Sequence, residues 1–311
     1  MRIAQAVVDA CVSVIFPAPC RICGAVLTRA GLLPICEECF GKLQPLRGPV
    51  CVCCGRPFFS EIALDAESPK CFACRRGVYA FDYARSFGSY TDQMVRAIGL
   101  LKYERLTALG RWFAQRLEEV TRENVVLKEA DVVVPVPLHP ARLRERGYNQ
   151  AELIAKPLAR AMRLPLVSYL LVRTKARPSR LLLSRRERWL TVRGAYDIRK
   201  GARVDNLHIL LIDDVFTTGA TLDACSRALK RAGAKSVAGL TVARAVSRAA
   251  ADTAASGQKF TTSREPAASK EEAQDRARKG PDGAGKYGQP LQSERLTSPA
   301  ENFSDGGAAG R

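Results

Sequence analysis

A short stretch of the sequence, LLIDDVFTTGAT, places the carboxylates Asp213 and Asp214 between an aliphatic run and a loop rich in hydroxyl groups. Ligands of open α/β sheets bind beyond the carboxyl ends of the strands, which is where this acid pair is expected. The helix-like segment that follows would turn unpaired N–H groups toward the loop, and such helix starts favour anions. The loop consists of Thr217, Thr218, Gly219, Ala220 and Thr221.

This loop predicts a site for one phosphate group. Gly219 lets the backbone approach a phosphate closely, and three threonine hydroxyls can donate to its oxygens. The two aspartates would repel that phosphate, so we expect them to accept hydrogen bonds from sugar hydroxyls or to help position a divalent cation. A ligand that carries a phosphate group, two neighbouring sugar hydroxyls and a bound metal ion would be a ribose 5-phosphate. The alternative is an acid-rich turn that caps a helix, which does not need two acids and three threonines.

A basic segment follows a second strand-like run, DVVVPVP, which proline stops. A tight loop at the end of a strand, followed by guanidinium groups, suits a pyrophosphate. The alternative is the basic start of a surface helix. We interpret His139 as a loop residue. The candidate pyrophosphate residues are Val136, Pro137, Leu138, Arg142, Arg144 and Arg146.

The chain has 11 cysteines, most of them in four C-x-x-C pairs near its start. Two pairs are followed by glycine, in CRICG and CVCCG, and this turn is typical of a zinc knuckle. Eight thiolates make two closed, structural Cys₄ zinc sites. In sequence order, the ligands are Cys20, Cys23, Cys36 and Cys39 for one site and Cys51, Cys54, Cys71 and Cys74 for the other.

Alternatives to this arrangement are a cross-braced pairing of the same cysteines, or iron–sulfur clusters. Disulfides are disfavoured, because the chain shows no signal peptide and the C-x-x-C spacing is that of metal ligands, which indicates a reducing, cytoplasmic location. Cys53 is left as a spare thiol or a substitute ligand, while Cys11 and Cys225 read as small buried residues.

Strand-like and helix-like patterns alternate between residues 79 and 245 and predict parallel β-α-β units, hence an α/β fold. We expect buried strands at 131–137, 210–214 and 236–244, and a strand or hairpin at 80–90. Pro157 predicts a kink or break in the helix at 148–164. Gly233 is well placed to end the helix that follows the threonine loop.

Composition separates the chain into an N-terminal helix (1–18), a cysteine-rich module (19–78), an α/β domain (79–247) and a tail (248–311). The tail has few large apolar residues, so we expect it to be disordered. The N-terminal helix is too short to span a bilayer, and no other segment approaches that length, so no membrane insertion is expected. The net charge of +18 favours acidic partners such as nucleotides or nucleic acid.

The stretch LLIDDVFTTGAT resembles the phosphoribosyl pyrophosphate (PRPP) loop of type I phosphoribosyltransferases. The wording PVPLHPARLRERGYNQA is similar to the signature of the ComF family, which joins a double zinc ribbon to such a domain. The resemblance implies a Rossmann-like parallel sheet with a flexible hood. It implies that Asp213 and Asp214 contact the ribose hydroxyls, that Thr217–Thr221 hold the 5-phosphate, and that Mg²⁺ binds mostly through water and substrate oxygens.

Two departures from the family pattern lie in the hood. Arg180 stands where the family usually has Gln, and Thr191 stands where it usually has Asn. Residues of the hood read the acceptor base in this fold, so neither the acceptor nor its specificity follows from the sequence. The role of the tail and the oligomeric state do not follow either.

Two functions compete on these observations. The first is a Mg²⁺-dependent phosphoribosyltransferase, in which three arginines face the pyrophosphate and the acid pair holds the ribose. The second is a non-catalytic PRPP sensor that binds single-stranded DNA and acts with other competence proteins in DNA uptake, as the family implies. Aromatic residues near the cysteines could stack on bases. We expect Phe72 in the ribbon core and leave Phe58, Phe59 and Tyr79 open. A zinc-ribbon scaffold with a degenerate nucleotide fold is the weakest reading.

Overall fold

The structure, a computed structural model, describes residues 19–27, 31–58, 69–175 and 185–246. The predicted N-terminal helix with Cys11, the tail and Arg180 lie outside these residues. Among the described helices, none combines the length and the apolar character that crossing a bilayer requires.

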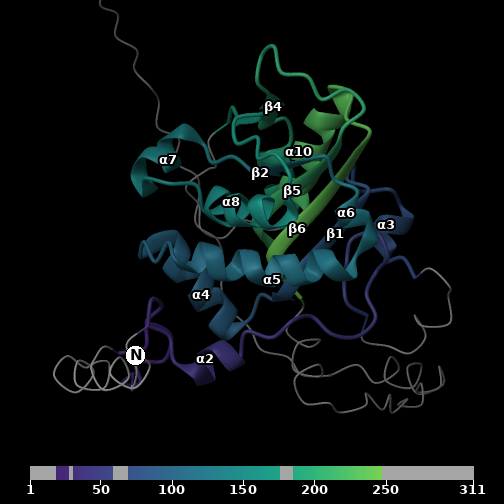
Figure 1. The fold of residues 1–311 in the computed structure, drawn as a ribbon. Coiled ribbons are helices and arrows are strands. Elements are labelled where there is room, and N and C mark those ends of the chain that lie inside the picture. Colours follow the sequence, from purple (N-terminus) through teal and green to yellow (C-terminus); the bar gives the residue numbers. More distant parts are fainter. Residues whose placement is uncertain (1–18, 28–30, 59–68, 176–184, 247–311) are drawn as a thin grey trace, which may run out of the picture. The chain divides into compact units, whose positions relative to one another are not determined.

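Four parallel strands form the central sheet in the order β1-β6-β5-β2 (Figure 1). The strands β3 and β4 form a second, two-stranded antiparallel sheet. The parallel α/β sheet predicted from the sequence is therefore confirmed. The strands are β1 Tyr83–Ser89, β2 Val132–Pro135, β3 Leu171–Arg173, β4 Tyr196–Ile198, β5 His208–Phe216 and β6 Ser236–Arg244.

The strand β5 runs two residues beyond the predicted end at Asp214. Val215 and Phe216 continue the ladder, because they pair in register with Ala243 and Arg244 of β6. The strand is buried along nearly its whole length, as expected of a central strand covered on both faces.

Helices connect the strands and cover the sheet (Figure 1). Two of them, α5 and α8, pack together on one face, while α10 packs on β5 and β6 from the other face. The described helices are α2 Glu37–Gly41, α3 Phe72–Arg75, α4 Asp92–Tyr103, α5 Leu109–Glu123, α6 Val125–Lys128, α7 Pro140–Arg146, α8 Gln150–Met162, α9 Arg185–Val192 and α10 Ala220–Arg231.

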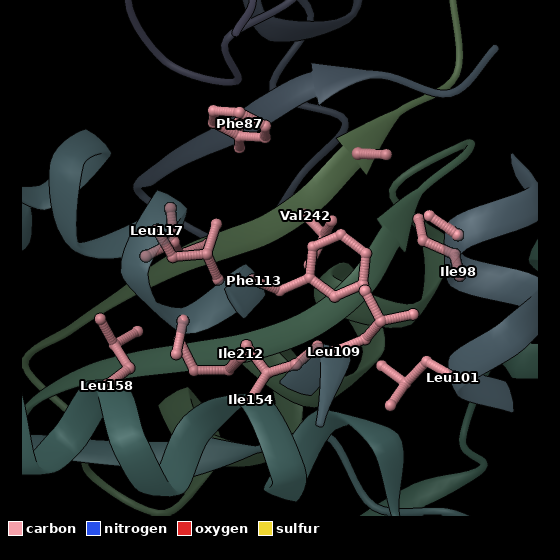
Figure 2. Packing of buried hydrophobic residues seen from close by; sticks show 14 of the residues in the cluster. Phe87, Ile98, Leu101, Leu109, Phe113, Leu117, Ile154, Leu158, Ile212 and Val242 are labelled. Atoms are coloured by element: carbon pink, nitrogen blue, oxygen red, sulfur yellow. The ribbon is translucent and has the colours of Figure 1, made fainter. Parts of the chain in front are cut away.

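Each face of the sheet carries its own apolar cluster. Figure 2 shows the cluster on the α5 and α8 side, where Phe113 lies beside Ile212 of β5 and Val242 of β6. The cluster on the α10 side contains Ile209 and Leu211 of β5. Successive side chains of a strand point to opposite faces, so β5 feeds both clusters alternately.

Two predictions about helix ends have different outcomes. Gly233 lies just past the end of α10 with φ of +98°, in the left-handed region that the predicted helix end requires. Of the kink or break predicted at Pro157, the break is wrong, because α8 continues through this residue. The apolar residues of its buried face, among them Ile154 and Leu158, pack against the sheet and hold the helix together across the missing N–H donor.

Candidate functional site

Asp213 and Asp214 lie near the carboxyl end of β5, and both are buried. The alternation along β5 places Asp214 on the α8 side of the sheet and Asp213 on the α10 side. The acid pair therefore presents one carboxylate to each face, rather than two side by side.

Asp214 has two partners that the sequence analysis did not name. Lys102, near the end of α4, donates to one carboxylate oxygen at 2.6 Å, and the side-chain amide of Gln150, at the start of α8, donates to the other at 2.7 Å. Burial alone would lower the pKa of Lys102, but the charge of Asp214 raises it, so the lysine stays charged. Gln150 stands in the YNQ of the stretch PVPLHPARLRERGYNQA, and the resemblance of that stretch was the signal that could have found it.

Asp213 accepts a hydrogen bond from the backbone N–H of Asp214 at 2.8 Å. Burial and the neighbouring charge of Asp214 together raise the pKa of Asp213 to about 7, against the opposing effects of Lys102 and Arg173. This carboxyl group therefore changes charge near neutral pH, whereas an ordinary aspartate is ionised there.

The threonine loop joins β5 to α10. Gly219 caps α10 with φ of +82°, and a Cβ added there would lie 2.7 Å from ring atoms of both Phe216 and Tyr79. Both the left-handed backbone and the close rings require glycine at this position. The Tyr79 hydroxyl donates to the carbonyl oxygen of Thr218 at 3.2 Å and fixes the loop from outside.

Three side chains of this loop keep hydrogen-bonding capacity for a ligand. The Thr218 hydroxyl accepts from the N–H of Ala220 at 3.4 Å, a long contact at the start of α10. The hydroxyls of Thr217 and Thr221 are half-buried and form no hydrogen bond with any residue of the described ranges. The loop thus offers hydroxyl donors in front of a helix N-terminus, as the phosphate prediction requires.

The predicted pyrophosphate loop, residues 136–138, follows β2, the strand that pairs with β5. Val136 is buried, and its N–H donates to the carbonyl oxygen of Ile212 at 2.9 Å, so this loop lies beside the acid pair. The amide of Asn149 donates to the carbonyl oxygen of Val136 at 3.0 Å, while Pro137 and Leu138 are half-buried. Next in the chain, His139 caps α7 by accepting from the Ala141 N–H at 3.2 Å, which agrees with its interpretation as a loop residue.

The three candidate arginines of α7 differ in their surroundings. Arg142 and Arg144 are exposed, whereas Arg146 is half-buried, with its guanidinium 5.3 Å from the centre of the Tyr103 ring. Arg146 also hydrogen-bonds to Gln150, the residue that holds Asp214. The structure thus links Arg146 to the acid pair and leaves the other two arginines in solvent.

The predicted hood is the segment RPSRLLLSRRERWLTVRGAY (177–196), and its described part forms α9 and reaches the first residue of β4. Trp189 of α9 stacks against Tyr79, with ring centroids 6.0 Å apart. Thr191, one of the two departures from the family pattern, is half-buried on α9. Arg180 lies outside the described residues.

The cysteines form two groups of four in sequence order, not the cross-braced alternative. In each group, the Sγ atoms all lie within 4.8 Å of one another, which fits four thiolates around one tetrahedral ion. Cys53 belongs to neither group, and Cys225 is buried, as predicted. Site 1 is Cys20, Cys23, Cys36 and Cys39, and site 2 is Cys51, Cys54, Cys71 and Cys74.

The prediction that Phe72 lies in the core of the ribbons is wrong. Its side chain is 62% exposed, and the guanidinium of Arg76 lies 4.9 Å from the centre of its ring. The short helix α3 buries none of its residues, so this aromatic ring faces solvent. Phe58 and Tyr79, in contrast, pack against the α10-side cluster, and Phe59 lies outside the described residues.

Comparison with known proteins finds both modules. A model of the double zinc ribbon domain matches residues 11–75, and a model of the phosphoribosyl transferase domain matches residues 149–268. Competence protein ComFC of Bacillus subtilis (strain 168) is 30% identical over 215 residues, which cover 68% of this chain and 84% of that protein.

Two further relatives show the same extent of similarity. Competence protein F of Haemophilus influenzae is 27% identical over 207 residues, covering 65% of this chain and 87% of that protein. DNA utilization protein YhgH of Escherichia coli (strain K12) is 29% identical over 224 residues, covering 71% and 94%. The chain belongs to the ComF family, in which a double zinc ribbon precedes a phosphoribosyltransferase-fold domain.

Proposed function

We propose that this protein binds PRPP at the carboxyl ends of β2 and β5 and transfers its phosphoribosyl group to an acceptor. Residues 19–78 would form the double zinc ribbon and residues 79–247 the phosphoribosyltransferase domain. The observation that carries the proposal is the placement of a buried acid pair beside a hydroxyl-rich loop that opens at the N-terminus of α10. The names of the relatives connect the family with competence and DNA utilization, so we propose a role in DNA uptake.

In this proposal, the loop Thr217–Thr221 holds the 5-phosphate, and the carboxylates of Asp213 and Asp214 accept hydrogen bonds from the ribose hydroxyls. The loop Val136–Leu138 with the arginines of α7 receives the pyrophosphate, and Arg146 is the arginine that the structure already connects to Asp214 through Gln150. Lys102 orients the carboxylate of Asp214. The protein contributes positioning and charge stabilisation, which dominate reactions at a phosphorylated sugar.

During transfer, the bond between the anomeric carbon and the pyrophosphate oxygen breaks, and pyrophosphate leaves with the electron pair. The acceptor nucleophile forms the new bond to that carbon. The positive charge that develops on the sugar ring is stabilised by nearby carboxylates. Asp213 and Asp214 offer the hard oxygen donors that suit Mg²⁺, which, when bound with PRPP, would supply charge neutralisation for the leaving pyrophosphate.

Calorimetric titration of PRPP with Mg²⁺ into the zinc-loaded protein tests this proposal. Thr221→Val removes one hydroxyl that has no hydrogen-bond partner among the described residues and leaves the fold intact. Loss of one hydrogen bond to a charged phosphate weakens binding by about tenfold or more. Thr107→Val, at an exposed position before α5, is the matched control and should bind like the wild type. Equal affinity of the two variants contradicts the assignment of the loop, and no binding by the wild type refutes the proposed function.

Pyrophosphate release with candidate acceptors separates the enzyme from the sensor. Release that depends on an added acceptor identifies a transferase. Tight PRPP binding without release for any nucleobase or nucleic-acid acceptor favours the non-catalytic sensor instead.

The exposed position of Phe72 favours a second candidate function, binding of single-stranded DNA by the zinc ribbon. A solvent-facing aromatic ring beside an arginine is the arrangement on which unpaired bases stack. Phe72→Ala should weaken the binding of a fluorescent oligonucleotide by about tenfold, the typical effect of losing one base-stacking ring. Tyr169→Ala is the control, because Tyr169 is 72% exposed but lies outside the ribbon module. Equal binding by both variants rules out Phe72 as a stacking platform.

A further inference from the structure

Arg244, the last residue of β6, is 4% exposed and reaches into site 2. Its guanidinium donates to the carbonyl oxygen of Cys54 at 2.7 Å and to the Sγ atom of Cys54 at 3.6 Å. Hydrogen bonds from the surroundings to the ligand sulfur orient metal ligands and tune the metal site. Arg244 therefore belongs to the immediate surroundings of the second zinc site, although it lies 190 residues away from Cys54 in the sequence.

The same guanidinium lies over a ring that supports the phosphate loop. The centre of the Phe216 ring is 3.9 Å from the guanidinium carbon of Arg244, and Phe216 pairs with Arg244 across β5 and β6. The Cζ atom of this ring crowds Gly219, where an added Cβ would lie 2.7 Å from it. Arg244 thus stands between a zinc ligand and the residue on which the loop turns.

The segment that follows Cys74 also holds the phosphate loop, through Tyr79 and Ala80. Ala80 lies six residues after Cys74, and its N–H donates to the Asp223 carboxylate in the first turn of α10 at 2.8 Å. Tyr79 donates to the carbonyl oxygen of Thr218. The position of the last zinc ligand therefore fixes the segment that holds both the loop and the start of α10.

The charge of Arg244 requires an anionic neighbour. A buried guanidinium without a counter-charge is strongly destabilising. Among the residues that the structure describes, the Arg244 side chain forms no ion pair with a carboxylate, and its hydrogen-bond acceptors are the carbonyl oxygen and the sulfur of Cys54. Four thiolates around one Zn²⁺ carry a net charge of about −2, which supplies that anion.

We propose that Arg244 is a positioning residue that couples site 2 to the phosphate loop, so that zinc at site 2 and PRPP at Thr217–Thr221 strengthen each other's binding. This inference rests on the proposed function. With the ion in place, Arg244 holds the Phe216 ring against Gly219 and keeps the loop in its binding shape. Without the ion, the guanidinium loses its anionic partner, and the ring and loop lose their support.

Substitution of the buried Arg244 and the half-buried Arg85 tests the coupling by calorimetry with PRPP and Mg²⁺. Arg244→Met should weaken binding by about tenfold, within the usual range of coupling between sites. Arg85→Met is the matched control, because Arg85 also donates to carbonyl oxygens at site 2, those of Cys51 and Val52, but lies over Tyr83 instead of Phe216. It should bind PRPP like the wild type. Arg244→Lys keeps the charge and should restore part of the loss.

Coupling is reciprocal, so zinc affinity provides a readout that does not depend on activity. In equilibrium competition with a colorimetric chelator, we expect PRPP with Mg²⁺ to raise the zinc affinity of one of the two sites about tenfold in the wild type. The affinity of the other site should be the same with and without PRPP, and Arg244→Met should abolish the effect.

The outcomes separate the two proposals. If the wild type binds PRPP but neither site gains zinc affinity, the coupling is refuted and the proposed function stands. Equal losses of PRPP affinity in Arg244→Met and Arg85→Met also overturn it, because they would show a general effect of disturbing site 2. A wild type that binds no PRPP refutes the proposed function and this inference together.

Discussion

The two Cys₄ sites share one ligand pattern but are attached to the α/β domain in different ways. Site 1 packs on the domain with its own side chains: Phe40 of α2 lies against Trp112 of α5, with ring centroids 5.3 Å apart, and Arg21 pairs with Glu104 at the surface. The chain that leaves site 1 meets β1 through its backbone, because the N–H of Leu46 donates to the carbonyl oxygen of Phe87 at 2.6 Å. The site 1 ligand Cys23 is exposed.

Site 2, in contrast, continues the sheet. The carbonyl oxygen of Cys53 accepts from the N–H of Ala84 in β1 at 2.7 Å, and the buried or half-buried Arg244 and Arg85 reach the ligand loop from β6 and β1. Strand edges are prone to unwanted pairing unless something covers them, and the Cys53 contact covers the outer edge of β1 at Ala84. The ligand loop of site 2 is therefore hydrogen-bonded directly to the sheet, while the ligand segments of site 1 are held to the domain by side-chain packing.

The largest expected effect comes from removing the first ligand of each site. Cys51 and Cys20 are matched, because both are buried and each sulfur accepts a backbone N–H at 3.3 Å. Cys51→Ser should destabilise the α/β domain by about 4 kcal/mol, since it leaves buried charges unpaired beside β1 and β6. In thermal unfolding, this is a decrease in Tm of roughly 10 °C, and Cys20→Ser should give less than half of it. Equal decreases would contradict the distinction between the sites.

Arg85→Met measures how much a single side chain contributes to the attachment of site 2 to β1. Arg85 donates to the carbonyl oxygens of Cys51, Val52 and Ala84, so its loss leaves several acceptors without a donor. We expect a loss of about 2 kcal/mol in the free energy of unfolding, measured by urea denaturation. A change within error would mean that the ribbon is held to β1 by its main-chain contacts alone.

A pH titration distinguishes the acid pair from both zinc sites. The pKa of Asp213 in the folded protein, about 7, lies above the ordinary value of 3.8. Folding therefore favours the protonated form, and this contribution to stability is present at low pH and is lost as pH rises through 7. PRPP binding needs the carboxylate, so affinity should rise about tenfold between pH 6 and pH 8.

Asp213→Asn is the control for this titration, because PRPP itself titrates in the same range and does so equally with both proteins. The wild-type affinity divided by that of Asp213→Asn should increase with pH. A constant ratio would show that the ionisation of Asp213 does not govern binding. Zinc content, measured at each pH, must stay unchanged for the comparison to hold.

The smallest effect is expected at the surface of site 1. Arg21 and Glu104 are both about half exposed, and ion pairs of this kind contribute about 0.2–1 kcal/mol. Arg21→Met should lower stability by no more than this amount and leave PRPP affinity unchanged, as measured by denaturation and calorimetry. A clear loss of affinity would connect site 1 to Lys102, which precedes Glu104 on α4, and would remove the functional difference between the two ribbons.

Local patterns in the sequence were sufficient for the elements and for the ligand groups. Alternating apolar segments predicted a parallel sheet, and the C-x-x-C spacing predicted which cysteines come together, because both depend on residues close in the chain. The position of Gly219 could be predicted for the same reason: a tight turn before a helix start restricts one residue directly. The prediction for Phe72 failed because aromatic character alone does not tell whether a ring finds a core to enter.

The sequence by itself determined the metal ligands, the acid pair, the hydroxyl-rich loop and the family. Only the tertiary structure decided what stands beside them. Lys102 reaches Asp214 across 112 residues, and Arg244 reaches Cys54 across 190 residues. The acid pair is divided between the two faces of β5, and site 2 is placed on the edge of β1. Contacts of this kind depend on how strands are ordered and helices packed, and no local spacing records that order.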